Sequence, residues 1–299
     1  MLLAGVKVPF QSEGQTKYYA VKLVDFEKPD NNDFLAVRQL IIEQHKQKRT
    51  DHLLYVNGLP LVLLEYKDPT NQSADIVQAY KQLGPTNYQK YIPRLFNYVS
   101  FLIISDRNFA RYGTMTAPFE RFSDWNDPDD PDKTVSNRLE MMQRLMLNKE
   151  TLLDIIQNFT EYESDGTNTI KKIAQQHQYL GVKVAVKRTK EVYPQKGDNK
   201  IGVIWHTTGS GKSLTMILFT NIVSQLKELE NPTFVVLTDR KDLDEQLGSF
   251  YEKAGFPYPK PKTAILEADS IIDLREKLAV PAGKIIFTTI QKFQTTQDE

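Results

Sequence analysis

Residues 49–69 read RTDHLLYVNGLPLVLLEYKDP, and this stretch carries the clearest structural signal in the first half of the chain. Asn57-Gly58 separates two apolar runs, which is the strongest short-range signal for a β-hairpin. The second run is apolar at successive positions, so it predicts a strand buried on both faces. It ends in Glu65-Tyr66-Lys67, and because side chains alternate along a strand, Glu65 and Lys67 share one face. Two charged groups at the end of a buried strand require partners or a function.

Asp51 lies on the first strand of this hairpin, and the face it occupies depends on the register. A strict two-residue turn pairs position 51 with position 64, which places the Asp51 carboxylate on the face opposite Glu65. One extra loop residue or a β-bulge pairs position 51 with 65 instead. We predict this irregularity, because it brings both carboxylates together with Lys67.

Two carboxylates and an ammonium group in one place can hold one or two Mg²⁺ ions on a phosphodiester, with Asp51 and Glu65 as metal ligands. Lys67 would then orient or deprotonate the attacking water. The spacing alone is explained equally well by an ordinary ion pair between Lys67 and one of the carboxylates.

A second motif occupies residues 202–213. Gly202–Trp205 predicts a buried strand and Ser213 onward a helix, with the loop HTTGSGK between them. Glycines allow backbone N–H groups to turn towards a β-phosphate, and the helix N-terminus adds its positive end. The usual pattern G-x4-G-K-[ST] has His206 in place of its first glycine. We predict an ATP-binding loop in which Lys212 reaches the β- and γ-phosphates and Ser213 binds the Mg²⁺ of ATP. The predicted contacts are Thr208, Gly209, Ser210, Gly211, Lys212 and Ser213.

The overall composition is that of a soluble globular protein, with 299 residues, 40% hydrophobic and 25% charged. This length allows one large domain or two ordinary ones. The absence of cysteine excludes disulfides, thiolate metal sites and a cysteine nucleophile, and the four histidines lack metal-ligand spacing. No apolar run is long enough to span a bilayer, and the first residues lack the features of a signal peptide. We therefore expect a cytoplasmic protein with no membrane partner.

The net charge is zero, with 38 basic and 38 acidic residues. A basic excess is the usual footprint of a nucleic-acid partner, so the balance by itself argues mildly against one. Locally, however, the charges separate: residues 171–190 hold cations and no acid, whereas the loop at 121–134 is rich in aspartate. Contact with DNA depends on the local face rather than on the sum, so a DNA partner is compatible with the balance.

Apolar runs of strand length alternate with segments of helical spacing, which predicts an α/β or α+β fold. We expect helices over 139–159 and from 213 to 226. The expected strands are 53–56, 61–66, 99–104, 202–205, 234–237 and 285–288. The segment at 163–168 reads ESDGTN and is a candidate linker, so we predict domains at 1–165 and 166–299.

Asp51, a hairpin and then Glu65-x-Lys67 resemble the PD-(D/E)xK nuclease motif, with Thr50 where its often-replaced proline would stand. The runs VNGLPLVLLEYKDP and IPRLFNYVSFLIISD are similar to the nuclease domain of type I restriction enzyme R (restriction and motor) subunits. This resemblance implies a PD-(D/E)xK restriction-endonuclease-like α/β domain at the start of the chain.

The same resemblance implies a Gln-x-x-x-Tyr element after the lysine. Here Gln82 is followed by Thr86 at that spacing, and Tyr88 and Tyr91 come later, as though a few residues were inserted. We assign the element to Gln82 and Tyr91.

The second half resembles the helicase-like motors of superfamily 2 in their R-subunit version. The run QHQYLGVKVAVKRT implies that Gln178 contacts adenine, although without the family a surface helical residue is the simpler interpretation. FVVLTDRKDLDEQL and KIIFTTIQKF resemble motor motifs Ia and Ib, which bind a DNA backbone through hydroxyl and N–H groups. The implied DNA contacts are Thr238, Arg240, Thr288 and Thr289, and capping of strand ends is the alternative role for each.

Together the resemblances imply an N-terminal piece of an ATP-dependent type I restriction endonuclease R subunit. The intact enzyme would cleave double-stranded DNA with Mg²⁺, coupled to ATP-driven translocation, with methyltransferase (M) and specificity (S) subunits as partners. Only 294–299 follow motif Ib, so we expect an incomplete RecA-like parallel-sheet domain that does not hydrolyse ATP competently. The alternatives are a nucleotide-binding or docking module without nuclease activity and a RecB-like repair nuclease–helicase.

Overall fold

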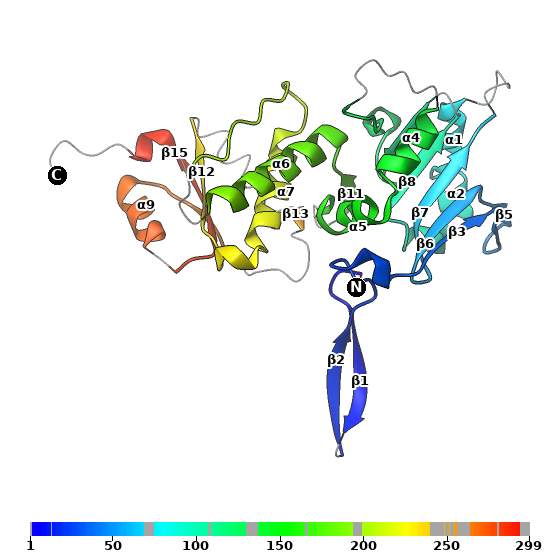
Figure 1. Cartoon of the computed structure of the whole chain (residues 1–299), viewed down its shortest axis with the longest axis horizontal. Helices are drawn as coiled ribbons and strands as arrows, with labels where there is room; N and C mark the ends of the chain where they lie inside the picture. The colour runs from blue at the N-terminus through cyan, green and yellow to red at the C-terminus, as the bar shows by residue number, and fades with distance from the viewer. Residues whose placement is uncertain are drawn as a thin grey trace. The chain divides into compact units, whose positions relative to one another are not determined.

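A computed structural model describes residues 2–12, 14–68, 75–106, 109–129, 137–164, 167–193, 199–239, 248, 251, 254–255, 264–279 and 281–293. The chain divides into two compact units (Figure 1). The first unit comprises residues 1–160 and 170–176, and the second comprises 161–169 and 177–299. The domain boundary predicted between residues 165 and 166 therefore falls within residues 161–176, of which 161–169 belong to the second unit and 170–176 to the first.

The first unit is built on a mixed five-stranded sheet with the order β3-β6-β7-β8-β9. Its strands are β3 (Phe34–Arg38), β6 (His52–Val56), β7 (Leu59–Tyr66), β8 (Phe101–Ser105) and β9 (Ala110–Gly113). β7 and β8 are parallel, whereas the other neighbouring strands are antiparallel. β7 is the middle strand and its residues 61–65 are all buried, which confirms the strand predicted to be covered on both faces.

The β6–β7 hairpin has the predicted turn and the predicted irregularity. Asn57 and Gly58 both have positive φ, 50° and 79°, as the tight turns that match strand twist require. The register shifts between Leu54 and Tyr55, and Leu61 is the extra residue on β7. His52 consequently pairs with Leu64, so the next position, Asp51, lies opposite Glu65. The predicted bulge is confirmed.

Helices α1 (Ile76–Leu83), α2 (Tyr88–Tyr91) and α3 (Pro93–Phe96) connect the parallel strands β7 and β8. Asp75 caps the N-terminus of α1, and its side chain accepts a hydrogen bond from the backbone N–H of Gln78, as N-cap residues commonly do. Its Ala79 and Leu83 are buried in the core with Leu63 of β7. The strand therefore leads into helices that pack back on the sheet, close to where β7 ends.

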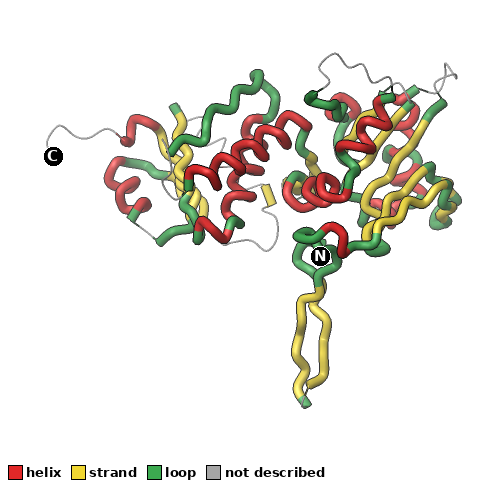
Figure 2. Tube along the Cα trace, viewed as in Figure 1, coloured by secondary structure: helices red, strands yellow, loops and turns green. Residues whose placement is uncertain are grey.

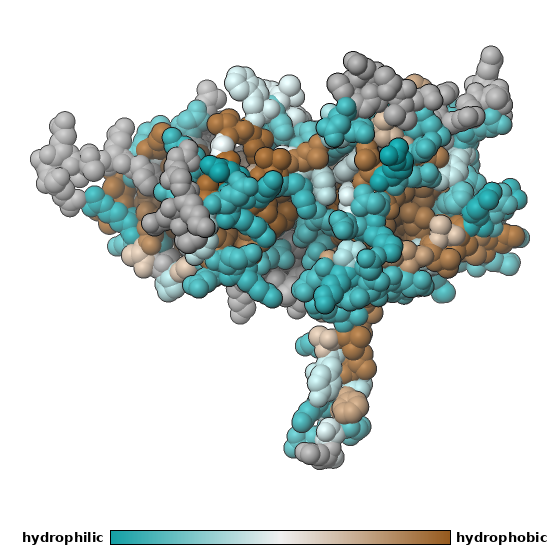
Figure 3. Space-filling view, viewed as in Figure 1, coloured by the Kyte–Doolittle hydropathy of each residue, from teal (hydrophilic) through white to brown (hydrophobic). Residues whose placement is uncertain are grey.

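The remaining elements of this part of the chain are short. Helices α4 (Arg138–Leu145) and α5 (Lys149–Asn158) confirm the helices predicted over 139–159. The rest are η1 (Pro29–Asn31), β4 (Ile41–Ile42), β5 (Lys48–Arg49), η2 (Phe119–Arg121), β10 (Thr160–Ser164) and β11 (Thr169–Ile173). At the start of the chain, β1 (Val6–Ser12) and β2 (Gln15–Val21) form a two-stranded sheet with no further strand among the described residues, and they expose apolar side chains (Figure 3).

The second unit contains a three-stranded parallel sheet with the order β12-β15-β14. The strands are β12 (Phe234–Thr238), β14 (Ala264–Glu267) and β15 (Lys284–Thr289), with α9 (Ile271–Leu278) between the last two. Helices α6 (Gln176–Val192) and α7 (Lys212–Ser224) are the longest in the described part of this unit (Figure 2). The other elements are η3 (Lys227–Leu229), β13 (Ala254–Gly255) and η4 (Ile290–Phe293). Within the described ranges, no helix has both the length and the apolar character to cross a membrane.

The strand predicted at Gly202–Trp205 is not formed. These residues have no regular secondary structure, and Val203 and Trp205 are 90% and 91% exposed. A central parallel strand needs a hydrogen-bonded neighbour and cover on both faces. Among the described residues, the sheet of the second unit takes up three other strands and leaves 202–205 without a ladder partner.

Candidate functional site

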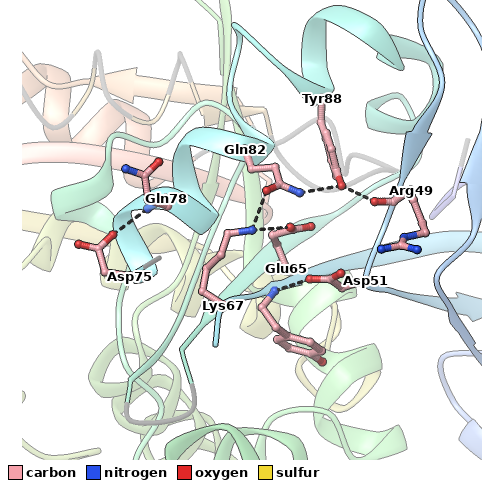
Figure 4. A network of polar contacts seen from close by, with 9 residues as sticks. Arg49, Asp51, Glu65, Lys67, Asp75, Gln78, Gln82 and Tyr88 are labelled. Carbon is pink, nitrogen blue, oxygen red and sulfur yellow. Dashed lines mark hydrogen bonds and ion pairs between the residues drawn. The ribbon is translucent and has the colours of Figure 1, made fainter. Parts of the chain in front are cut away.

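The structure brings the predicted carboxylates and lysine together where β7 ends (Figure 4). Asp51 Oδ2 accepts a hydrogen bond of 2.7 Å from the backbone N–H of Tyr66, which fixes the Asp51 carboxylate beside β7. Lys67 Nζ donates to Glu65 Oε1 at 3.0 Å. Glu65 is only 1% exposed. The bulge in the hairpin and the alternation of the strand are thus sufficient to place all three groups in one site.

Burial controls the electrostatics of this site. Loss of hydration and, secondarily, the nearby Asp51 charge raise the pKa of Glu65 to about 7, and Lys67 partly opposes both effects. The second oxygen of this carboxylate, Glu65 Oε2, is buried without a hydrogen-bond partner. A buried acceptor of this kind calls for an explanation, and a cation bound between the two carboxylates would supply both a partner and a compensating charge.

The donor set suits a hard divalent cation such as Mg²⁺, which prefers one or two carboxylates and keeps several waters. No group of three or more histidine, aspartate or glutamate side chains with metal-binding geometry occurs in the described part of the chain. Asp51 and Glu65 would therefore need water, backbone carbonyl or substrate oxygens to complete the coordination.

Gln82 joins the site from the last turn of α1, as predicted from the resemblance. Gln82 Oε1 accepts a hydrogen bond of 2.6 Å from Lys67 Nζ, and Gln82 Nε2 donates to the hydroxyl of Tyr88 at 2.9 Å. The Tyr88 hydroxyl donates in turn to the backbone carbonyl of Arg49 at 2.5 Å. This chain of contacts gives the lysine a second fixed partner besides Glu65 (Figure 4).

Tyr88, rather than the predicted Tyr91, is therefore the tyrosine that contacts Gln82. α1 ends at Leu83, and a turn closed by the hydrogen bond from Asn87 N to Gly84 O leads into α2. That turn accommodates the extra residues and places Tyr88, which is 2% exposed, against the network. Tyr88 was among the candidates along the sequence, but spacing could not reveal how much chain the turn would use.

The phosphate loop runs from His206 to Ser213 and leads into α7. Gly209 and Gly211 have φ of 80° and 82°, a backbone conformation that glycine adopts without strain. Thr208, Gly209, Gly211 and Lys212 are exposed, whereas Ser210 and Ser213 are partly exposed. Lys212 Nζ donates to the carbonyl oxygens of His206 and Thr207 at 2.9 and 3.0 Å. The predicted loop and helix are present, and the lysine contacts its own loop.

Gln178 lies beside this loop on α6. It is 2% exposed, which excludes the interpretation of a surface helical residue. Its Nε2 donates to the carbonyl oxygen of Gly211 at 3.0 Å. A Cβ on Gly211 would lie 2.6 Å from this nitrogen, which would then have to shift, and the positive φ of Gly211 favours glycine at this position. Gln178 and the loop are thus brought together, and the contact of Gln178 with adenine that the resemblance implies stays a prediction.

The predicted DNA contacts of the second unit have different surroundings. Thr238 at the end of β12 is partly exposed, and Arg240 lies outside the described residues. Thr288 and Thr289 are 0% and 6% exposed. Both lie at the end of β15, the middle strand of the sheet, and the Thr288 hydroxyl is buried. This burial argues against the expected contacts with a DNA backbone at the two positions, which stay predictions.

Comparison with known proteins gives consistent matches to two families. Residues 1–121 match the family model described as type I restriction enzyme R protein N terminus, and residues 177–299 match that of the SWI2/SNF2 ATPase. The whole chain is 40% identical over 306 residues to the type I restriction enzyme HindI endonuclease subunit of Haemophilus influenzae, and it spans 29% of that protein.

Two further relatives agree. A protein of Methanocaldococcus jannaschii, named as a candidate endonuclease subunit of a type I restriction enzyme, is 34% identical over the whole chain, which spans 30% of it. The type I restriction enzyme SauCOLORF180P endonuclease subunit of Staphylococcus aureus is 28% identical over 96% of the chain and 28% of its own length.

Proposed function

Residues 1–121 belong to the type I restriction enzyme R protein N-terminal family, and the whole chain is related to endonuclease subunits of these enzymes; on this premise, we propose that the first unit is a Mg²⁺-dependent DNA endonuclease domain of the PD-(D/E)xK kind. The observation that carries the proposal is the convergence of Asp51, Glu65 and Lys67 at the end of β7, with a buried carboxylate oxygen that has no partner.

In this proposal Asp51 and Glu65 hold the metal ion. Mg²⁺ bound there supplies Lewis-acid polarisation of the scissile phosphate. Lys67 orients the attacking water, and its ammonium group is held at a defined point by hydrogen bonds to Glu65 and Gln82. Tyr88 keeps the Gln82 carboxamide in the orientation that presents oxygen to the lysine. Supporting contacts of this kind set the precision of a catalytic site.

For the second unit we infer a partial RecA-like domain that binds ATP at residues 206–213, with Ser213 as the ligand to the Mg²⁺ of the nucleotide. A parallel sheet, a glycine loop that opens α7 and the match to the SWI2/SNF2 ATPase support this assignment. The chain spans about 29% of the length of the Haemophilus relative. For the complete protein we propose double-stranded DNA cleavage coupled to ATP-driven translocation, with methyltransferase and specificity subunits as partners.

A plasmid-nicking assay with Mg²⁺ tests the nuclease assignment. Asp51→Asn, Glu65→Gln and Lys67→Ala are each expected to reduce nicking by about 100-fold or more, as loss of a catalytic group does. Lys81→Ala removes an exposed lysine from α1 and serves as the matched control with unchanged nicking. Wild-type rates in all three site variants would overturn the assignment. Binding of ATP without any Mg²⁺-dependent cleavage by the wild-type chain would favour the alternative of a nucleotide-binding or docking module.

A further inference from the structure

Three lysines surround the ring of Tyr91, the tyrosine that the candidate active site does not use. The ammonium groups of Lys46, Lys48 and Lys90 lie 5.3, 4.7 and 5.6 Å from the centroid of this ring. These distances are within the range of a cation–π attraction. Lys48 belongs to β5 and Lys46 to the turn between β4 and β5, whereas Lys90 and Tyr91 belong to α2. The cluster is therefore assembled from two segments that are distant in the sequence.

Backbone and side-chain hydrogen bonds join these two segments. The backbone N–H of His45 donates to the carbonyl oxygen of Tyr91 at 3.1 Å. Gln44 Oε1 accepts a hydrogen bond of 3.2 Å from the backbone N–H of Arg94. The β4–β5 turn is thus attached to α2 and α3, and the lysines are held over a ring whose backbone position is fixed.

The positive charges of this cluster are not neutralised by neighbouring acids. In the described part of the chain, Lys46, Lys48, Lys90 and the adjacent Arg49 form no ion pair with a carboxylate. By contrast, Lys149 in the same unit lies 2.7 Å from Asp30. The acids nearest in sequence are Asp51, which belongs to the candidate active site, and Glu43, which is exposed. Several like charges gathered on one ring repel one another, and a bound anion would relieve that repulsion.

The cluster adjoins the candidate active site through residues in direct contact. Lys48 Nζ lies 6.0 Å from the ring centroid of Tyr88 as well. The Tyr88 hydroxyl bonds to the Arg49 carbonyl and to Gln82, which holds Lys67. Lys48 and Arg49 also stand only three and two residues before Asp51 in the chain.

We infer that Lys46, Lys48 and Lys90, gathered around Tyr91, together with the adjacent Arg49, bind the phosphate backbone of duplex DNA and hold the strand across the Asp51–Glu65 site. This inference rests on the proposed nuclease function. Flexible ammonium groups act as point charges for phosphate without reading sequence. Such contacts position a substrate independently of sequence, as an enzyme that leaves recognition to other subunits requires. Duplex DNA is favoured over an acidic protein because the cluster borders a site whose side chains suit phosphodiester chemistry.

Binding of a short fluorescent duplex to the complete chain, followed by anisotropy in EDTA at increasing salt, tests the inference. The triple variant Lys46→Gln, Lys48→Gln, Lys90→Gln is expected to bind at least about 10-fold more weakly. The slope of log affinity against log salt concentration should be smaller in magnitude by about 2 to 3 for this variant. Each lost phosphate contact reduces the magnitude of the slope by about 0.9. A control triple variant, Lys22→Gln, Lys28→Gln, Lys149→Gln, removes the same charge from the same unit and should leave affinity and slope unchanged.

The ring itself is tested at Tyr91. Tyr91→Phe retains the aromatic face and should bind as the wild type does, whereas Tyr91→Ala should weaken binding several-fold. Unchanged affinity and slope in the lysine triple variant would overturn the inference, as would an equal loss in the control variant. Polyglutamate serves as a probe for an acidic protein partner. If the lysine triple variant loses polyglutamate binding but keeps DNA binding, the cluster binds an acidic protein and the inference is overturned.

The outcomes also separate this inference from the nuclease assignment. If Asp51→Asn abolishes nicking while the lysine variant binds DNA normally, the nuclease stands and the binding surface fails. If binding depends on the lysines but the chain never cleaves DNA, the surface stands and the nuclease fails.

Discussion

The Asp51–Glu65 site and the phosphate loop at 206–213 both arise from short motifs, but the chain holds their lysines in different ways. Lys67 has a side chain that is 17% exposed and is bonded to groups from β7 and α1. Lys212 is exposed and contacts carbonyl oxygens of its own loop. The first lysine is held in a defined position before any ligand binds, and the second must leave its loop partners to reach a phosphate.

The supporting structure explains this difference. β7 is hydrogen-bonded on both edges and is buried from residue 61 to residue 65. The side chains at its end are therefore attached to a rigid strand. The segment before the phosphate loop is without a strand partner in the described part of the chain and exposes Val203 and Trp205. Sites on rigid elements hold their side chains more accurately than sites on loops. Three substitutions test whether the two sites differ in this way.

The largest effect is expected at the phosphate loop. Lys212→Ala should weaken binding of a fluorescent ATP analogue by about 100-fold, or about 2.7 kcal/mol, because a charged contact to phosphate is lost. Nicking without ATP should be unchanged, since Asp51 and Glu65 lie in the other unit. Lys227→Ala removes another exposed lysine of the second unit and should leave nucleotide binding intact. A nicking rate that fell with Lys212→Ala would show that the two sites are not independent.

A somewhat smaller effect is expected from removing the support of Lys67. Gln82→Ala should lower the Mg²⁺-dependent nicking rate by about 10- to 100-fold, the usual cost of losing a residue that orients a ligand or catalytic group. Gln78→Ala is the matched control, because Gln78 is exposed on the same helix, one turn earlier. Equal rates for the two variants would mean that the Lys67 position does not depend on the Gln82 contact.

The smallest effect concerns the stability cost of the buried carboxylate. Because the folded-state pKa of Glu65 is raised from 4.5 to about 7, the free energy of unfolding should fall as pH rises through this window. Glu65→Gln lacks this titration and should be more stable than the wild type by about 1 to 2 kcal/mol above pH 7 without metal, after allowance for the lost Lys67 contact. The difference should shrink as pH falls towards 4.5, and Mg²⁺ should stabilise the wild type alone.

Tryptophan fluorescence can follow this transition. The chain has two tryptophans, and Trp125 is 5% exposed in the first unit. Placing Trp205→Phe in both proteins leaves Trp125 as the single reporter during urea unfolding. A Glu65→Gln variant that is less stable than the wild type at pH 8 would contradict the assigned cost of the charge.

The sequence predicted the first site well because its information is local. A two-residue turn with positive φ, the alternation of a strand and the need to bring Asp51 opposite Glu65 were enough to predict the bulge that the structure contains at Leu61. The second unit was predicted less completely. Gly202–Trp205 has the composition of a buried strand, but whether it becomes one depends on a neighbour that composition does not specify.

Three features of the sites depend on tertiary contacts that the sequence does not reveal. The turn after α1 selected Tyr88 over Tyr91 as the partner of Gln82. The central place of β15 buried Thr288 and Thr289, which the motif suggested for DNA. The attachment of the β4–β5 turn to α2 gathered three lysines around Tyr91.

The hairpin, its charged end, the glycine loop and the helices with clear periodicity could be predicted from the amino-acid sequence, because each depends on residues a few positions apart. The sequence did not predict which tyrosine, threonine and lysine side chains would be accessible to a ligand, because this depends on the folded structure. These properties depend on burial and on contacts between segments tens of residues apart. A sequence pattern gives neither the spatial distance between two residues nor the burial of a side chain.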